Sequence, residues 1–71
     1  MYRRPVESSL IRSVGYDLPS SVLEIEFAAT GRIYEYLDVP LSVYSRLMAS
    51  PSIGTYFNEH VREMYPYQEI G

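Results

Sequence analysis

Hydrophobic residues recur at every second position in the first half of the chain, which is the spacing of β-strands. The alternation is cleanest over residues 22–29, where the apolar side chains face one way and Glu24 and Glu26 face the other. Less regular stretches of the same kind flank it, with turn residues between them. The pattern therefore predicts a three-stranded antiparallel meander, with strands over residues 8–14, 22–29 and 32–38.

The cost of burying a charge indicates which side chains of the second and third predicted strands, over residues 22–29 and 32–38, face the core. With a two-residue turn, the facing pairs are Phe27 with Tyr34, Ile25 with Tyr36, and Glu26 with Glu35. A shift by one position would bury Glu35, which costs far more than a like-charge pair on a wet face. Tyr34 and Tyr36 are therefore predicted on the buried face. Ile33 and Leu37 then form a small apolar strip on the opposite face.

The second half of the chain changes to three- and four-residue spacing, which is typical of helices. Pro40 is favourable at a helix start, so a first helix is predicted over residues 41–49. Ser50-Pro51-Ser52 ends it and starts a second helix, which is predicted over residues 52–64. The expected fold is α+β, with a three-stranded antiparallel meander and two short C-terminal helices packed on one face.

The composition of the 71 residues fits one small domain and excludes several classes of site. We expect a flexible N-terminal arm over 1–7, a domain over 8–65 and a tail over 66–71. The absence of cysteine excludes a disulfide scaffold and a thiolate zinc site, and a single histidine excludes a two-histidine site within one chain. No apolar stretch approaches the ~20 residues that span a bilayer, and the start lacks a signal core. We therefore expect a cytoplasmic protein.

Little in the sequence has the spacing of catalytic groups, so we expect no enzyme, no cofactor and no metal. His60 is a lone histidine on a helix flank and is interpreted as a packing residue. Glu24, Glu26 and Glu35 are interpreted as a solvated strand face instead of a cation site. The net charge of −3 opposes nucleic-acid binding at long range, although all six basic residues are arginine, the better bidentate partner for phosphate.

A Tyr-x-Tyr, Tyr34-Glu35-Tyr36, lies at the centre of the chain. The residues around it are Ser9, Ile11, Val14-Gly15-Tyr16-Asp17, Leu23, Ile25, Phe27 and Gly31 before it, and Val39-Pro40, Tyr44, Leu47, Ser52, Gly54, Tyr56-Phe57-Asn58 and Tyr65 after it. In this order the set resembles the KTSC domain family, a module named for its place at the C-terminus of some lysyl-tRNA synthetases and also found in stand-alone bacterial and phage proteins.

The resemblance implies a small binding module of unestablished function, with weak RNA binding as the leading hypothesis. The candidate RNA-binding residues are Arg12, Arg32, Arg62, Tyr16 and Asn58. The motif residues expected in the core are Tyr34, Tyr36, Phe27, Tyr56 and Phe57. The alternative is a protein–protein or homodimerisation module that binds no nucleic acid and uses Ile33 and Leu37.

Overall fold

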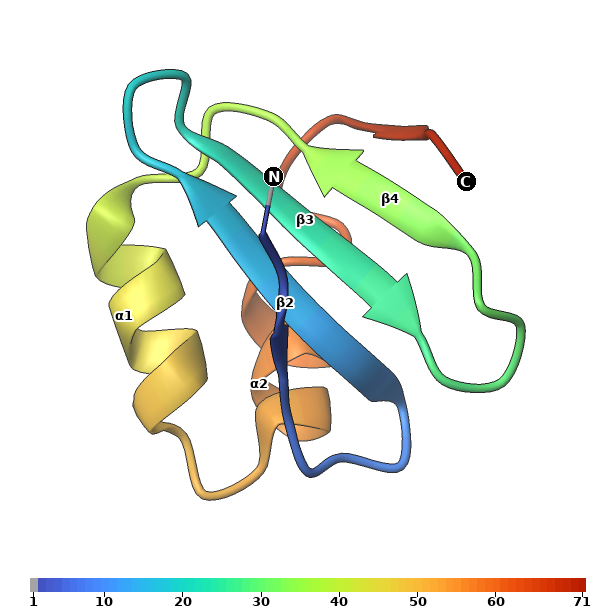
Figure 1. Ribbon diagram of the computed structural model, residues 1–71. Helices are drawn as coiled ribbons and strands as arrows, with labels where there is room; N and C mark the ends of the chain where they lie inside the picture. The colour runs from blue at the N-terminus through green and yellow to red at the C-terminus, as the bar shows by residue number, and fades with distance from the viewer. Residues whose placement is uncertain (1) are drawn as a thin grey trace.

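The computed structural model describes residues 2–71, and Met1, the first residue of the expected arm, lies outside them. The chain forms one antiparallel sheet whose spatial order follows the sequence, β1-β2-β3-β4-β5. Its elements are β1 (Arg4–Pro5), β2 (Ile11–Asp17), β3 (Val22–Phe27), β4 (Ile33–Tyr36), α1 (Leu41–Ala49), α2 (Ile53–His60) and β5 (Tyr67–Glu69) (Figure 1). Within residues 2–71, neither helix has the length and apolar character needed to cross a membrane.

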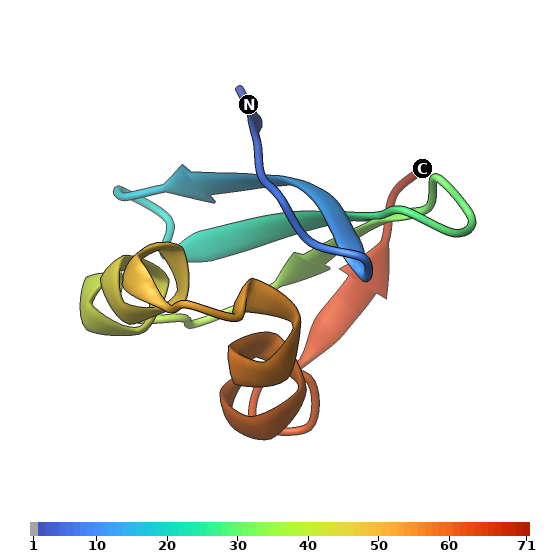
Figure 2. The same ribbon diagram turned by 90° about the horizontal axis from the view of Figure 1, so that it is seen from below.

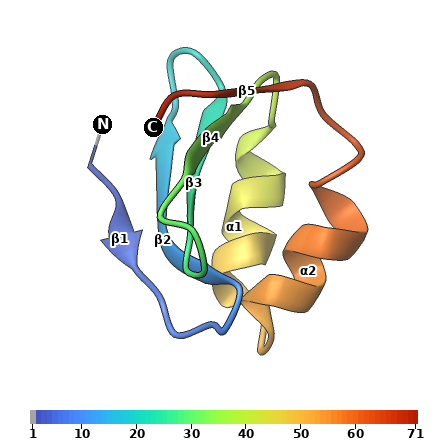
Figure 3. The ribbon, with the colours of Figure 1, turned by 90° about the vertical axis from the view of Figure 1, so that its right-hand side faces the viewer.

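Both helices cover one face of the sheet, which we call the inner face (Figure 2). The edge strand β1 is displaced toward the opposite, outer face, which carries no helix (Figure 3). The core lies between the helices and the inner face. Its fully buried side chains come from both layers and the segments beside them: Ile11, Val14, Leu23, Ile25, Tyr36, Val39, Leu47, Phe57 and Val61.

The α+β class is confirmed, but the sheet has five strands instead of the expected three. Both additional strands lie outside the expected domain, β1 in the arm and β5 in the tail. Arg4 pairs with Val14 on one edge, and Tyr67 pairs with Tyr36 on the other. These strands have two and three residues, which is too short for the alternation that identifies a strand in a sequence.

The first predicted strand is also displaced, from residues 8–14 to Ile11–Asp17. The Ser8 hydroxyl accepts hydrogen bonds from the amides of Leu10 and Ile11, at 3.2 and 3.3 Å, which delays the start of the strand. Gly15, which follows the first predicted strand, is paired with Glu24 of β3 and belongs to β2.

The side-chain parity predicted for the β3–β4 hairpin is confirmed, but the register is wrong by two residues. Tyr34 and Tyr36 lie on the inner face as expected. The facing pairs are Leu23 with Tyr36, Glu24 with Glu35, Ile25 with Tyr34, and Glu26 with Ile33. The Phe27 carbonyl accepts from the Gly31 amide at 2.8 Å, and the Phe27 amide donates to the Arg32 carbonyl at 2.9 Å. Residues 28–31 therefore form the loop, in place of the expected two-residue turn.

The first helix has the predicted bounds, whereas the second ends at His60 instead of residue 64. The amides of Val61 and Arg62 both donate to the Phe57 carbonyl, at 3.0 and 2.9 Å, which closes the helix. Val61 is fully buried, so the chain turns into the core at this point. The early end of α2 leaves part of the inner face without a helix over it.

The outer face holds a buried carboxylate, contrary to the solvated face expected for Glu24 and Glu26. Glu24 is 4% exposed because Arg3 reaches across β2 to form an ion pair with it. Gly15 lies opposite Glu24 in the register and adds no side chain to this face. Ser13 accepts from Arg3 Nε at 3.1 Å and donates to Glu26 Oε1 at 2.8 Å.

The apolar strip expected at Ile33 and Leu37 is half-buried. The tail runs beside it: the Ile33 amide donates to the Gly71 carbonyl at 3.1 Å, and the Ile33 carbonyl accepts from the Ile70 amide at 2.8 Å. The tail thus pairs with the edge of β4 next to this strip.

Candidate functional site

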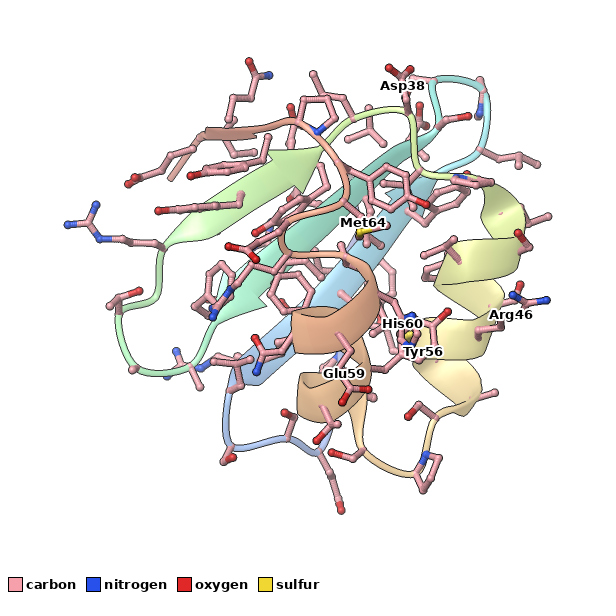
Figure 4. The ribbon with its side chains drawn as sticks, turned by 180° about the vertical axis from the view of Figure 1, so that it is seen from behind. Asp38, Arg46, Tyr56, Glu59, His60 and Met64 are labelled. Atoms are coloured by element: carbon pink, nitrogen blue, oxygen red, sulfur yellow. The ribbon has the colours of Figure 1, made fainter. Side chains whose placement is uncertain are left out.

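A groove of about 840 Å³ opens on the inner face beyond the end of α2. In Figure 4, which views the helix side, the chain after α2 passes in front of the sheet at Met64. This segment, the β3–β4 loop and strands β4 and β5 border the groove. We call it the aromatic groove and define it by six of the residues that line it: Phe27, Arg32, Tyr34, Tyr36, Arg62 and Tyr67.

The rings of the aromatic groove hold one another in place. Tyr34 stacks on Tyr67 with ring centroids 5.2 Å apart and an interplanar angle of 11°. Phe27 packs edge-to-face on Tyr34, with ring centroids 5.3 Å apart. Tyr36 packs in the same way on the buried Phe57, with ring centroids 5.4 Å apart. Such pairs are favourable beyond the area that they bury. The groove therefore offers a fixed aromatic surface, of which Phe27 and Tyr34 are only half-buried.

The two arginines of the groove are held in different ways. Arg32 Nη1 donates to both carboxylate oxygens of Glu69, at 3.2 and 2.9 Å, and this pair is exposed. Arg62 instead places its guanidinium carbon 5.5 Å from the ring centroid of Phe57 and 6.0 Å from that of Phe27. Arg62 is thus positioned by cation–π contacts, which leave its N–H groups available.

Tyr36 connects the core with the groove. Its side chain is 2% exposed and also lines the groove. Burial raises the pKa of the Tyr36 hydroxyl from 10.0 to about 12, against the lowering effect of the Arg62 charge, while Tyr67 and Tyr34 raise it further. The hydroxyl therefore stays protonated at neutral pH and can donate a hydrogen bond.

Of the five candidate RNA-binding residues, the structure brings Arg32 and Arg62 together in the aromatic groove and places the others elsewhere. Arg62, expected on the second helix, lies beyond its end. Arg12 donates to the Ala28 carbonyl at 3.2 Å and does not line the groove.

Tyr16 and Asn58 also lie outside the groove. The Tyr16 hydroxyl donates to the Val39 carbonyl at 2.6 Å, and its ring stacks on Tyr44 at 4.8 Å, so it joins β2 to the start of α1. Asn58 is exposed and lines a separate pocket of about 300 Å³ beside the start of α2. In that pocket the Ser52 hydroxyl already accepts from the Thr55 amide, as the cap of the helix.

Two predicted core residues, Tyr56 and Phe57, and the lone histidine, His60, lie on α2. Phe57 is fully buried, and Tyr56 is half-buried with its ring centroid 4.5 Å from that of His60 (Figure 4). His60 is exposed, and its Nε2 lies 3.9 Å from a Glu59 carboxylate oxygen. Between residues 2 and 71 there is no group of three or more potential metal ligands.

The sequence reasoning missed Tyr67, which supplies a stacking ring from the tail. The available signal was Tyr65-Pro66-Tyr67, with tyrosines at alternate positions on either side of a proline. Aromatic residues are favoured in strands, and β5 begins at Tyr67, the last residue of this segment.

Comparison with known proteins places these features in a family. The model of the KTSC domain matches residues 7–65. A crystal structure of a KTSC domain protein from Yersinia pestis has a TM-score of 0.94 and 37% identity, covering 99% of this chain and 97% of that one. A protein of Stutzerimonas stutzeri is 41% identical over 99% of both chains. A lysine–tRNA ligase of a Nostoc species is 36% identical over 90% of this chain, which spans 11% of the ligase.

Proposed function

The chain belongs to the KTSC domain family, and from this premise we propose that it is a small non-enzymatic module that binds single-stranded RNA in the aromatic groove. The observation that carries the proposal is the presence of aromatic rings and two arginines in one groove. Aromatic rings stack on unpaired bases, and arginines bind the phosphates between them. The similarity to a segment of a lysine–tRNA ligase supports RNA as the polymer.

The geometry favours unpaired nucleotides over a duplex. The rings of Phe27 and Tyr34 lie within a concave site, which a base can reach only when it is out of a helix. Stacking of one base on an aromatic side chain contributes about 1–3 kcal/mol. A groove of this size therefore binds through a few nucleotides and without extensive base readout.

The charge of the groove limits the affinity. The arginines are accompanied by Glu63, which also lines the groove, and by Glu69, which pairs with Arg32. The whole chain carries a net charge of −3. Few phosphate contacts give a shallow dependence on salt and a dissociation constant on the order of 10⁻⁴–10⁻⁶ M.

The test is a titration of labelled tRNA and single-stranded oligonucleotides at low and at physiological salt. We expect weak association that moderate salt abolishes and that Arg32→Ala weakens. Arg46→Ala is the matched control, because Arg46 is exposed on α1 and does not line the groove (Figure 4). Absence of association at low salt, together with a molecular mass that rises with concentration, would overturn the proposal and favour the dimerisation alternative.

A further inference from the structure

The hydroxyl of Tyr36, which lines the aromatic groove, is a hydrogen-bond donor that has no acceptor among residues 2–71. Tyr36 is 2% exposed, and its hydroxyl forms no hydrogen bond with another residue between 2 and 71. Within the same residues, no fully enclosed side-chain oxygen or nitrogen lacks a partner. The Tyr36 hydroxyl must therefore reach the open space of the groove, which Tyr36 lines. A hydroxyl that reaches a groove from a buried ring, and that has no partner among residues 2–71, can donate a hydrogen bond to a ligand in the groove.

Arg62 supplies further donors beside this hydroxyl. The described part of the chain offers it no carboxylate within ion-pair distance and no hydrogen-bond acceptor. Arg62 and Tyr36 line the same groove and pack on the same ring: the guanidinium carbon of Arg62 lies 5.5 Å, and the ring centroid of Tyr36 5.4 Å, from the ring centroid of Phe57. Arg32 differs, because Glu69 already occupies its guanidinium.

We propose that Tyr36 and Arg62 form an oxyanion subsite that holds one phosphodiester of the bound strand. This inference rests on the proposed function and goes beyond it, because it assigns the phosphate to two named donors. A hydroxyl and a guanidinium match the two non-bridging oxygens of a phosphodiester. A singly charged diester suits the site better than a terminal phosphate, because Glu63 also lines the groove and repels added negative charge.

The same geometry ranks the two arginines of the groove. Binding a phosphate at Arg32 would first break the bonds to Glu69, whereas binding at Arg62 breaks no bond between residues of the described chain. The rings of Phe27 and Phe57 hold the Arg62 guanidinium in advance, which lowers the entropy lost on binding. Arg62 is therefore expected to contribute more to phosphate binding than Arg32.

The experiment compares three probes by amide NMR shifts: a short oligouridylate, dimethyl phosphate and uridine. Tyr36→Phe is the principal variant, because it removes only the hydroxyl and keeps the buried ring. Arg62→Gln removes the second donor, and Arg12→Gln is the matched arginine control outside the groove. We expect oligouridylate to bind about tenfold more weakly to Tyr36→Phe and to Arg62→Gln, and unchanged to Arg12→Gln.

The outcomes separate the subsite from the proposed function. If oligouridylate binds all variants alike, the subsite is overturned and RNA binding stands. If no oligonucleotide binds but dimethyl phosphate shifts the amides around Tyr36 in the wild type and not in Arg62→Gln, RNA binding is overturned and the oxyanion subsite stands. If neither oligouridylate nor dimethyl phosphate has an effect, both are overturned. Shifts with uridine equal to those with oligouridylate would also overturn the subsite, because uridine carries no phosphate.

Discussion

The two tyrosines of β4 show how one face of the sheet divides into a covered and an open region. Tyr36 is 2% exposed and packs against Phe57 of α2, in the covered region. Tyr34, two residues earlier on the same face, is half-buried and stacks on Tyr67 of the tail, in the open region. Tyr36 thus packs its ring in the core and reaches the groove only at its edge, whereas Tyr34 lies within the groove.

The boundary between the two regions follows from the length of α2. A helix that continued to residue 64, as the apolar spacing predicts, would extend the covered region. Val61 instead turns into the core, and the chain beyond it becomes the wall of the aromatic groove. A difference of one helical turn therefore decides whether this face contributes only stability or also a binding surface.

The largest expected effect is the loss of the Tyr36 ring. Tyr36→Ala should lower the free energy of unfolding by roughly 3–4 kcal/mol, because it leaves a cavity in the core. Tyr34→Ala should cost only about 1–2 kcal/mol, because Tyr34 is half-buried and solvent can fill its place. Urea unfolding followed by circular dichroism measures both. Equal losses would contradict the division of the inner face.

The faces of β3 and β4 could be predicted from the sequence, because a carboxylate in the core costs far more than one in water. The parity of Tyr34 and Tyr36 follows from that cost alone. The register could not be predicted in the same way, since a shift by two residues keeps every side chain on its face. The observed register goes with the loop of residues 28–31, which the hydrogen bonds of Phe27 with Gly31 and Arg32 close.

The groove itself could be predicted only in part. Arg32 and Arg62 were candidates, but Tyr67 was not, because β5 has three residues and too little pattern to be recognised. The buried Glu24 was missed for a related reason. Its burial depends on its ion pair with Arg3, which precedes β1 and lies far from Glu24 in the sequence.

The second effect concerns the ionisation of Tyr36 at alkaline pH. The pKa is about 12 in the folded protein and 10.0 in the unfolded chain, so the folded state retains its proton longer. The stability that this provides is complete below pH 10 and is lost as the pH rises through 12. The loss amounts to roughly 2–3 kcal/mol, at about 1.4 kcal/mol for each pH unit.

Tyr36→Phe isolates this contribution, because it has no hydroxyl to ionise. Its stability should fall less steeply than that of the wild type between pH 10 and 12. Parallel curves for wild type and Tyr36→Phe, measured by urea unfolding at each pH, would show that the hydroxyl of Tyr36 is not desolvated.

The two arginine–glutamate ion pairs of the sheet also differ in burial: the Arg3–Glu24 pair includes a buried carboxylate, and the Arg32–Glu69 pair is exposed. Arg3→Ala should cost about 2 kcal/mol, because it leaves the Glu24 carboxylate, 6% exposed, without its partner. Arg32→Ala should cost less than about 1 kcal/mol, because its pair with Glu69 is exposed. Urea unfolding of both variants makes the comparison.

Glu24→Gln provides the second arm of this experiment. Added to Arg3→Ala, it should restore part of the lost stability, because a neutral amide is less costly to bury than an unpaired carboxylate. A double variant no more stable than Arg3→Ala alone would mean that Glu24 gains access to water once the arginine is removed.

A small effect is expected in the loop between β3 and β4, at the open end of the groove. Gly31 has a φ of +72°, a left-handed conformation that side chains disfavour, and a Cβ there would meet no atom within 4 Å. Gly31→Ala should therefore cost about 1 kcal/mol through the backbone alone. Gly31→Asn is the matched control and should cost less, since asparagine tolerates this conformation better than alanine. Equal losses in urea unfolding would point to contacts of the side chain. The expected order, with asparagine the milder change, would show that the cost comes from the left-handed backbone conformation of residue 31 in the loop that leads into β4.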